Sequence, residues 1–285
     1  MVYFESIPSR DRSILLAGGI AFFWLMETAF PLFRFSYRKW KHAGINIFFT
    51  LTTIIVNFAL AFLLLQTSRW TQENHWGLLT YLNQIPLIGY TILGLMGLDL
   101  ISAYFIHWLE HKVRFMWRFH LIHHTDIHVD TTTANRHHPG ESLFRFIFTT
   151  LAVFILGAPV WMIMLYQALS VVLSQFNHAN IRLPEKLDQW LSLVIVTPNM
   201  HHVHHHYILP QTDSNYGNIF SIWDRIFRTF SYMKQEDIKY GIDTHLAENE
   251  HSRISRMLKI PFEPYRSPVG GKFTSNGDKE KRLPF

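Results

Sequence analysis

Apolar residues recur along the chain in four long runs, separated by segments rich in polar and basic residues. A helix needs about 20 mostly apolar residues to cross a bilayer. Residues 14–33, 45–65 and 85–106 reach that length. The fourth run, 146–173, is interrupted by Gly157-Ala158-Pro159, which predicts a helical hairpin that dips into the membrane and returns. The pattern therefore predicts an all-α integral membrane bundle of about four spanning or hairpin helices.

The more polar segments beside these runs predict a helical cap on one side of the membrane. We expect this cap to comprise residues 107–145 and 174–262, and residues 1–265 to form a single membrane-embedded domain. Residues 266–285 are rich in Pro, Gly, Ser and Lys and show no apolar period, which predicts a flexible tail.

The charges of the loops predict how the bundle is oriented. Basic residues crowd segments 34–41 and 112–118, whereas the loop 66–84 carries only Arg69 and Glu73. The positive-inside rule then places the first and third connections, together with the cap, in the cytosol. The N-terminus would face the opposite side. The same sorting accounts for the net charge of +5 without any nucleic-acid partner.

The composition supports a membrane location and limits the redox chemistry. Charged residues make up only 16% of the chain, against about 25% in soluble domains, so part of the surface is expected to face lipid. There is no cysteine, which excludes disulfides, thiolate-ligated haem and cysteine-held iron–sulfur clusters. Any redox reaction must therefore draw its electrons from a separate protein.

Histidine gathers in three clusters at helical spacing. Residues three and four apart share one face of a helix, with Cβ atoms about 5–6 Å apart, so each cluster can aim two or three imidazoles at a common point. Imidazole suits iron, zinc, copper and nickel rather than magnesium or calcium. We expect eight rings to converge and to hold more than one metal ion. The eight are His107, His111, His120, His123, His124, His201, His204 and His205.

Two local signals accompany these clusters. Asp99 lies two turns before His107, where a carboxylate could orient a ligand imidazole through its other ring nitrogen. Thr197 and Pro198 fit the N-cap and the first position of a helix that carries the third cluster. His202 and His206 lie between and after the residues of that cluster, and we expect their side chains to point away from the common metal site.

The remaining histidines divide into candidate ligands and residues without a clustered partner. His178, in Asn177-His178-Ala179-Asn180, and His138, which precedes Pro139, are candidates to complete the metal shells. The histidines without clustered partners are expected to be surface or interface residues. They are His42, His75, His245 and His251.

The sequence does not match the residue spacing of several other known functional motifs. The chain contains no HExxH run, which disfavours a zinc protease of that type. His138-Pro139-Gly140-Glu141 is faintly similar to a cytochrome b5 haem loop but lacks its second glycine. No glycine-rich phosphate loop precedes a helix, so nothing supports nucleotide binding.

With these residues in place, the chain resembles the fatty acid hydroxylase/sterol desaturase superfamily of integral membrane di-iron enzymes over roughly residues 30–235. Two departures are visible: Trp108 stands where an arginine often follows the first histidine, and Arg228 replaces the usual glycine before Thr229. Neither touches a presumed ligand. Besides the three clusters, the resemblance rests on Asp99, Thr125-Asp126, Asp130-x-Thr132-Thr133, Arg136-x-His138-Pro139, Phe176-x-His178-x-Asn180, Thr197-Pro198, Asn215-Tyr216-Gly217 and Trp223-Asp224-x-x-Phe227.

The resemblance implies a fold, a cofactor and a reaction. The bundle and its cytosolic, histidine-rich cap would enclose two iron ions, held by the eight clustered histidines with His178 and His138 as further ligands. Dioxygen would be the co-substrate, and hydrogen would be removed from an unactivated C–H bond. The substrate would be a sterol-type or fatty-acyl lipid from the bilayer, hydroxylated or desaturated. Electrons would come from a separate cytochrome b5, ferredoxin or reductase type of protein.

Two alternative functions stay open at this point. A membrane protein that binds metal for transport or storage would also need clustered histidines, although a transporter should carry its ligands at mid-membrane in broken helices. An inactive family member with a structural zinc site is the other alternative. Zinc in a purified sample would not decide between them, because zinc outcompetes ferrous iron at many nitrogen sites.

Overall fold

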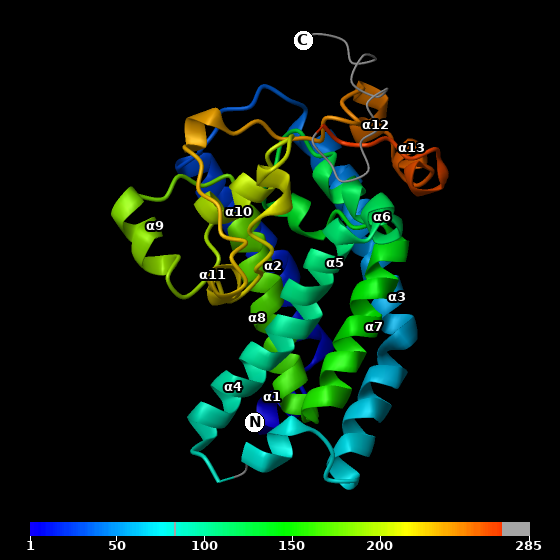
Figure 1. Cartoon of the computed structure of the whole chain (residues 1–285), viewed down its shortest axis with the longest axis vertical. Coiled ribbons are helices and arrows are strands. Elements are labelled where there is room, and N and C mark those ends of the chain that lie inside the picture. The colour runs from blue at the N-terminus through cyan, green and yellow to red at the C-terminus, as the bar shows by residue number, and fades with distance from the viewer. Residues whose placement is uncertain (83, 270–285) are drawn as a thin grey trace.

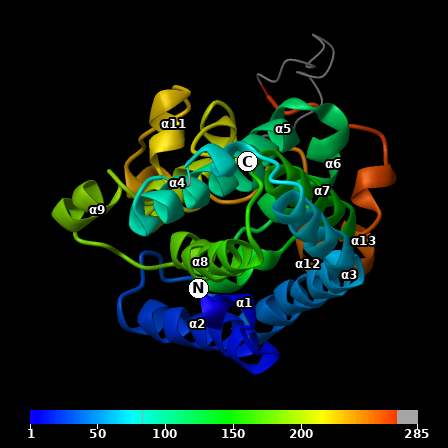
Figure 2. The ribbon, with the colours of Figure 1, turned by 90° about the horizontal axis from the view of Figure 1, so that it is seen from below.

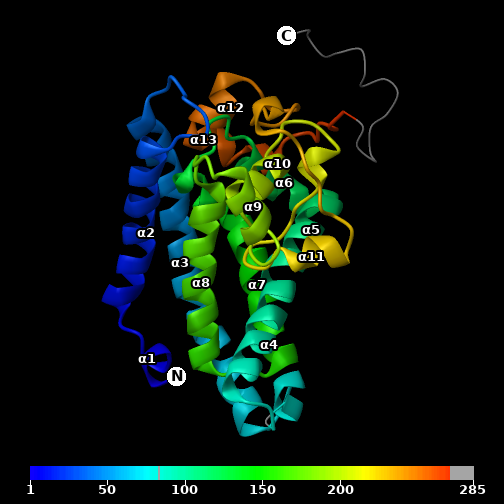
Figure 3. The same cartoon turned by 90° about the vertical axis from the view of Figure 1, so that its left-hand side faces the viewer.

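The computed structural model of this protein describes residues 1–82 and 84–269. These residues form an all-α structure whose only β pairing is three isolated bridges. Five helices are long and apolar enough to cross a membrane, and they stand side by side while shorter segments gather at one end (Figures 1 and 3). They are α2 (Ser9–Ala29), α3 (Lys39–Glu73), the continuous segment Leu87–Lys112, α7 (Pro139–Leu156) and α8 (Val160–His178).

The predicted hairpin is confirmed as α7 and α8, but each helix is long enough to cross the membrane. The bundle therefore has five candidate spans rather than four. The turn between the two helices depends on Gly157, which ends α7 in the left-handed conformation at φ 67°. The C-terminal end of α3 stabilises this turn through two hydrogen bonds. Gln72 Nε2 donates to the Gly157 carbonyl at 2.7 Å, and Ser68 Oγ donates to the Ala158 carbonyl at 2.7 Å.

The third span is interrupted near its upper end. It begins as α4 (Leu87–Asp99), passes through a π-helical segment, η2 (Leu100–Phe105), and continues as α5 (Ile106–Lys112). A π-helical segment is rare and frequently marks a functional site. Here it joins the apolar part of the span to the turn that carries the first histidine cluster.

Each of the other predicted spans overlaps a long apolar helix of the structure, but the ends of the helices differ from those of the apolar runs. The first span begins at Ser9 and ends at Ala29, and α3 covers 35 residues rather than 21. At about 1.5 Å per residue α3 is about 52 Å long, which exceeds the roughly 30 Å hydrocarbon core. Hydropathy identifies only the apolar part of a helix, so α3, which continues past the apolar run at both ends, appears too short in the sequence.

The shorter segments at the histidine-bearing end form what we call the cap. Together with the connecting loops it contains α6 (Arg114–His124), α9 (Glu185–Leu191), α10 (Pro198–His204), α11 (Ile222–Ile226), α12 (Glu248–Ser252) and α13 (Ile254–Met257). The single-turn helices η3 (Thr131–Asn135), η4 (Gln211–Asp213), η5 (Gln235–Asp237) and η6 (Ile260–Phe262) lie in its loops, whereas α1 (Val2–Glu5) and η1 (Leu78–Leu82) lie at the opposite end (Figure 3).

The predicted tail lies largely outside the described residues, which end at 269. Its first residues are bound to the cap: Arg266 Nη2 is 2.7 Å from Glu250 Oε1, and the Val269 amide donates to Asp243 Oδ2 at 2.7 Å. The flexible tail predicted for 266–285 therefore does not begin at Arg266.

Two of the five apolar clusters among the described residues are the largest. The larger lies between the spans, where α8 stands between α2 and α4 while α7 packs against α3 and α4, as the view from below shows (Figure 2). Buried Leu98, Phe146 and Met162 belong to this core. The second core joins the upper end of α3 to the cap through Phe49 and Ile122.

A buried polar network fastens α3 to the loop after α6. His42 Nε2 lies 2.8 Å from both carboxylate oxygens of Asp126, and Arg136 Nη1 donates to Asn46 Oδ1 at 3.0 Å. The expectation that His42 is a surface or interface residue without a partner is therefore wrong. Its partner lies 84 residues further along the chain, beyond the reach of any local pattern.

Candidate metal centre

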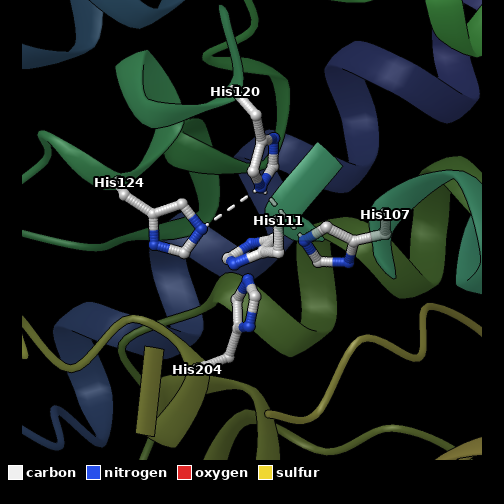
Figure 4. A group of neighbouring side chains, drawn as sticks. All are labelled: His107, His111, His120, His124 and His204. Atoms are coloured by element: carbon white, nitrogen blue, oxygen red, sulfur yellow. Dashed lines mark hydrogen bonds between the residues drawn. The ribbon is translucent and has the colours of Figure 1, made fainter. Parts of the chain in front are cut away.

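Among the described residues, nine buried or nearly buried histidines form two groups. Within each group, one ring nitrogen of every histidine lies within 4.8 Å of those of the others. Figure 4 shows the first group, in which rings from three segments of the chain point toward a common centre. The first group contains His107, His111, His120, His124 and His204, and the second contains His123, His178, His201 and His205.

Helix periodicity explains how the clusters are shared between the two groups. Successive residues of a helix are rotated by about 100°, so residues four apart differ by only about 40°. On α6, His120 and His124 therefore face the first group, while His123 faces the second. The same rule sends His201 and His205 of the third cluster to the second group and His204 to the first. Each of these two clusters therefore contributes histidines to both groups, whereas the sequence predicted that each cluster points at one common site.

The two groups are adjacent. The rings of His124 and His205 stack with centroids 4.9 Å apart, and those of His201 and His204 stack at 5.1 Å. Because each pair joins one ring of each group, two cations held in the groups would be close neighbours. His107, His111 and His178 lie on the upper ends of spans, so the histidines are not confined to the cap.

Hydrogen bonds fix the tautomer of four of these imidazoles. In each, Nδ1 faces an oxygen that only accepts, so Nδ1 carries the proton and Nε2 is left with its lone pair. This assignment follows from the hydrogen-bond network. The four contacts are His107 Nδ1 to the Tyr216 carbonyl (2.9 Å), His204 Nδ1 to the Ser214 carbonyl (2.6 Å), His178 Nδ1 to the Ser174 carbonyl (2.7 Å) and His120 Nδ1 to Glu141 Oε1 (2.8 Å).

The Nε2 atoms of three of these rings lie close to other ring nitrogens. His120 Nε2 lies 3.1 Å from His107 Nε2, and neither nitrogen carries a proton to share. In the second group His178 Nε2 lies 3.1 Å from the Nε2 atoms of both His123 and His201. Two imidazoles bound to one ion at about 2.1 Å have nitrogens about 3.0–3.4 Å apart. The spacing therefore fits rings that share a cation.

Other nitrogens in the two groups are buried without a hydrogen-bond partner. They include His111 Nε2, His204 Nε2 and both ring nitrogens of His205. A buried polar atom normally has a partner, and leaving one without costs about 1–3 kcal/mol. A metal ion would satisfy these nitrogens, so the donor set fits a cation such as iron or zinc.

Burial also keeps these imidazoles neutral. Loss of hydration lowers the pKa of His120 to about 4, although the neighbouring Glu141 carboxylate opposes this shift. The pKa values of His124 and His204 are lowered well below the usual histidine value by burial and by neighbouring imidazoles. Because metals bind the neutral ring, these sites are ready to accept a cation at neutral pH.

The structure adds a charged network beside the first group that sequence reasoning missed. Arg145 Nη2 donates to Glu110 Oε2 at 2.6 Å, and Arg145 Nε donates to Glu141 Oε1 at 3.0 Å. His137 Nδ1 is 2.6 Å from the same Glu141 oxygen, and His120, His137 and Glu141 form a third set of potential ligands. The sequence did contain a signal for Glu110 and Glu141, because each lies one to three residues from a predicted ligand.

His138 does not join either group. It is the N-cap of α7, where its Nδ1 accepts a hydrogen bond from the Gly140 amide at 3.0 Å, and its Nε2 lies 3.4 Å from the Leu258 carbonyl. The predicted contribution of His138 to a metal shell therefore has no support in this geometry. Its neighbour His137 occupies the place beside the site instead.

Asp99 has a different role from the predicted one. Its carboxylate accepts hydrogen bonds from the Ile219 amide (3.2 Å), the Phe220 amide (3.1 Å) and Trp223 Nε1 (3.1 Å), and the Tyr216 carbonyl orients His107. Asp99 thus holds the loop that presents Tyr216, rather than touching a ligand itself. The N-cap predicted at Thr197 is confirmed, and His202 and His206 lie outside both groups as predicted.

A small cavity lies between the histidine groups and the upper ends of the spans. Its wall combines imidazoles of both groups with small residues and with the polar side chains of Arg145 and Asn218. The lining includes His107, His123, His178, His201, Ala103, Ala134, Ser174 and Gly217.

Fold and site together define a helical membrane protein in which two adjacent groups of buried imidazoles lie at one end of the bundle. Residues 91–229 match the sequence model of the Fatty acid hydroxylase family, and this region contains all nine grouped histidines. This match over just under half of the chain, together with the relatives described below, supports the fatty acid hydroxylase superfamily.

Three relatives illustrate the range of similar proteins. The chain is 28% identical over 148 residues to the ornithine lipid hydroxylase of Rhizobium tropici, which aligns 52% of this chain with 44% of that protein. It is 32% identical over 150 residues to the alkylglycerol monooxygenase of Xenopus tropicalis, covering 53% of this chain and 32% of the relative. A cholesterol 25-hydroxylase-like protein of Danio rerio is 26% identical over 162 residues, covering 55% and 63%.

The alignment thus spans less than half the length of the first two of these relatives. No solved structure matches the chain.

Proposed function

We propose that this protein is a membrane di-iron oxygenase that hydroxylates or desaturates a C–H bond of a membrane lipid. The two adjacent groups of closely spaced, buried imidazole nitrogens carry this proposal, because they suit two transition-metal ions held close together. The relatives support the class of reaction, since their names describe hydroxylases and monooxygenases of lipids. The position of the groups at one end of the spans disfavours a transporter, whose ligands should lie at mid-membrane.

The chain's own residues would hold and orient the metal pair. The Tyr216, Ser214 and Ser174 carbonyls lock their imidazoles with Nε2 aimed inward, and Glu141 does the same for His120. The all-imidazole shells are neutral, so the buried carboxylates of Glu110 and Glu141 would balance part of the metal charge. When bound, a pair of ferrous ions would reduce dioxygen and thereby provide the oxidant for an unactivated C–H bond.

The cavity would receive the carbon that is oxidised. It is bordered by the small residues Ala103, Ala134 and Gly217 and by rings of both histidine groups, and it lies where the spans meet the cap. A lipid would approach it from the bilayer, because the spans end beside it. A sterol-type or fatty-acyl lipid fits this approach.

Electron supply and orientation complete the proposal. Because the chain has no cysteine, we infer a separate electron donor of the cytochrome b5, ferredoxin or reductase type. The basic segments 34–41 and 112–118 lie at the histidine-bearing end of the bundle, which supports a cytoplasmic location for that end.

The test is anaerobic reconstitution with ferrous iron, followed by Mössbauer spectroscopy and by mass analysis of lipids from expressing cells. We expect a coupled di-iron signal and lipids that have gained one oxygen or lost two hydrogens. His204→Ala should abolish both, because His204 Nε2 faces the first group. His75→Ala, which alters an exposed histidine far from the site, should change neither.

Two results would contradict the proposal. A mononuclear iron signal with unchanged lipids would favour a metal-handling protein. Tightly bound zinc that iron does not replace, again with unchanged lipids, would favour an inactive protein with a structural zinc site.

A further inference from the structure

Two segments of the cap that are distant in sequence lie together on one flank of the molecule. The residues after α9 pair with those before α11: the Val196 amide donates to the Ile219 carbonyl at 3.0 Å, and the Ser221 amide donates to the Val194 carbonyl at 3.2 Å. Figures 1 and 2 show α9 and α11 on the same side of the cap, near the upper part of the third span.

This flank exposes large apolar side chains. Trp190 is 74% exposed and Ile226 is 56% exposed, although each lies in a short helix of the cap. Contiguous exposed apolar surface on a protein marks a site that contacts another apolar phase or partner. We call the surface the apolar flank, and it comprises Leu187, Trp190, Leu193, Val194, Ile226 and Phe227.

The contacts of α11 fix the depth of the flank relative to the membrane. The Phe220 amide and Trp223 Nε1 both donate to Asp99, and Tyr104 Oη lies 2.8 Å from Thr229 Oγ1. At about 1.5 Å per residue, positions 99–104 of the third span lie about 18–26 Å along the helix from Leu87. The hydrocarbon core is about 30 Å thick, so a span that enters it near Leu87 carries α11 at the upper edge of the core.

The charges around the flank match a lipid surface. Arg182, Lys186 and Arg228 are exposed close to it in the sequence, and the Arg225 guanidinium lies 4.6 Å from the centre of the Phe230 ring. The acidic residues of α9 are Glu185 and Asp188, so basic side chains outnumber acidic ones around the flank. Apolar side chains bordered by basic ones are typical of surfaces that insert into the interface of anionic membranes. Trp190 suits the same position, because its ring is apolar and its N–H can reach water or headgroups.

From this placement we propose that the apolar flank inserts into the cap-side interface of the bilayer, with its basic edge on anionic headgroups. The cap would then rest on the membrane through α9 and α11 in addition to the five spans. The inserted segment is continuous with the loop that presents Tyr216 to His107, so membrane contact would also steady one wall of the cavity. This inference does not depend on the oxygenase activity.

The natural absence of cysteine allows a direct test. Leu193→Cys and Ile226→Cys are each labelled with a nitroxide in the full chain and reconstituted in vesicles of phosphatidylcholine and phosphatidylglycerol. Electron paramagnetic resonance then measures collision with dioxygen, which concentrates in lipid, and with a water-soluble nickel chelate. Phe58→Cys, on the exposed face of α3, serves as the lipid reference, and Glu248→Cys, exposed on the cap, serves as the water reference.

We expect both flank positions to show a several-fold lower nickel accessibility than Glu248→Cys, and a dioxygen accessibility between those of Glu248→Cys and Phe58→Cys, because dioxygen is less concentrated at the interface than in the middle of the bilayer. Nickel accessibility equal to that of Glu248→Cys would overturn the proposal. Exclusion of both reagents together with spin–spin broadening would also overturn it, because it would show a second copy of the chain on the flank. Two positions are used so that failure of one variant to fold leaves the test intact.

Discussion

The behaviour of the candidate metal centre depends on the partner of each imidazole's second nitrogen. His107, His178 and His204 use backbone carbonyls, whereas His120 uses the carboxylate of Glu141. Backbone partners are insensitive to side-chain substitution, so Glu141 is the position where the orientation of a predicted ligand can be changed without touching the ligand.

Glu141→Ala should weaken the affinity of the first histidine group for metal about 10–100-fold, since His120 loses the acceptor that fixes its tautomer. Glu141→Gln should lose less, because its amide oxygen can still accept from Nδ1. Chelator competition with Co²⁺, followed by its visible absorption, measures the affinity of each group. Glu248→Ala, at an exposed glutamate, is the matched control. Unchanged Co²⁺ affinity in Glu141→Ala would show that His120 needs no orienting partner.

At the scale of elements, the two helices that carry the second and third clusters each divide their histidines between the two groups. The sequence identifies the clusters but suggests that each aims at one point. The rotation of about 100° between neighbouring residues separates His123 from His124, and His204 from His205. Which ring joins which group is settled only when α5, α6, α8 and α10 pack together.

The turn between α7 and α8 is the other element that depends on a single residue. Gly157 has φ 67°, and a Cβ built there would lie 2.0 Å from the Trp76 carbonyl oxygen. Gly157→Ala should therefore destabilise the fold by at least about 1 kcal/mol, from the left-handed backbone alone, and the contact with Trp76 should add to this. The measurement is the apparent melting temperature in detergent.

Gly44→Ala provides the comparison for this variant. Gly44 lies in α3 and no atom stands within 4 Å of a Cβ built there, so alanine should be neutral or stabilising by up to about 1 kcal/mol. Equal melting temperatures for the two variants would show that the turn tolerates a side chain.

At the scale of the whole molecule, the N-terminus and the cap lie at opposite ends of the five candidate spans (Figure 3). If all five cross the membrane, these ends lie on opposite sides of it, and the sides predicted from loop charges stay a prediction. The hairpin adds one crossing, and α8 ends at the same face as the third span. The histidines of both spans, His107 and His178, therefore lie at one level.

The sidedness itself can be measured with single cysteines. Tyr81→Cys lies in η1 at the end opposite the cap and is 83% exposed, while Glu248→Cys lies on the cap. A membrane-impermeant maleimide added to intact cells should label Tyr81→Cys, and should label Glu248→Cys only after the membrane is opened. The reverse pattern would place the histidine-bearing end outside the cytoplasm.

The sequence by itself determined the features that arise within one helix or one apolar run. The spans around residues 14–33, 45–65 and 85–106, the clustered histidines and the N-cap at Thr197 all follow from helical period and local hydrogen bonding, which act over a few residues. The same local basis also led to an error. Residues 139–145 include polar and charged side chains, so hydropathy assigned them to the cap, whereas in the structure they form the first turns of α7.

Tertiary structure decided everything that depends on contacts between distant segments. It paired His42 with Asp126, assigned Asp99 to the 219–223 loop, and placed His137 rather than His138 beside the metal groups. Burial gives these contacts their strength, because a polar group removed from water must find a partner wherever the fold supplies one. No spacing along the chain identifies that partner, since the packing of the helices chooses it.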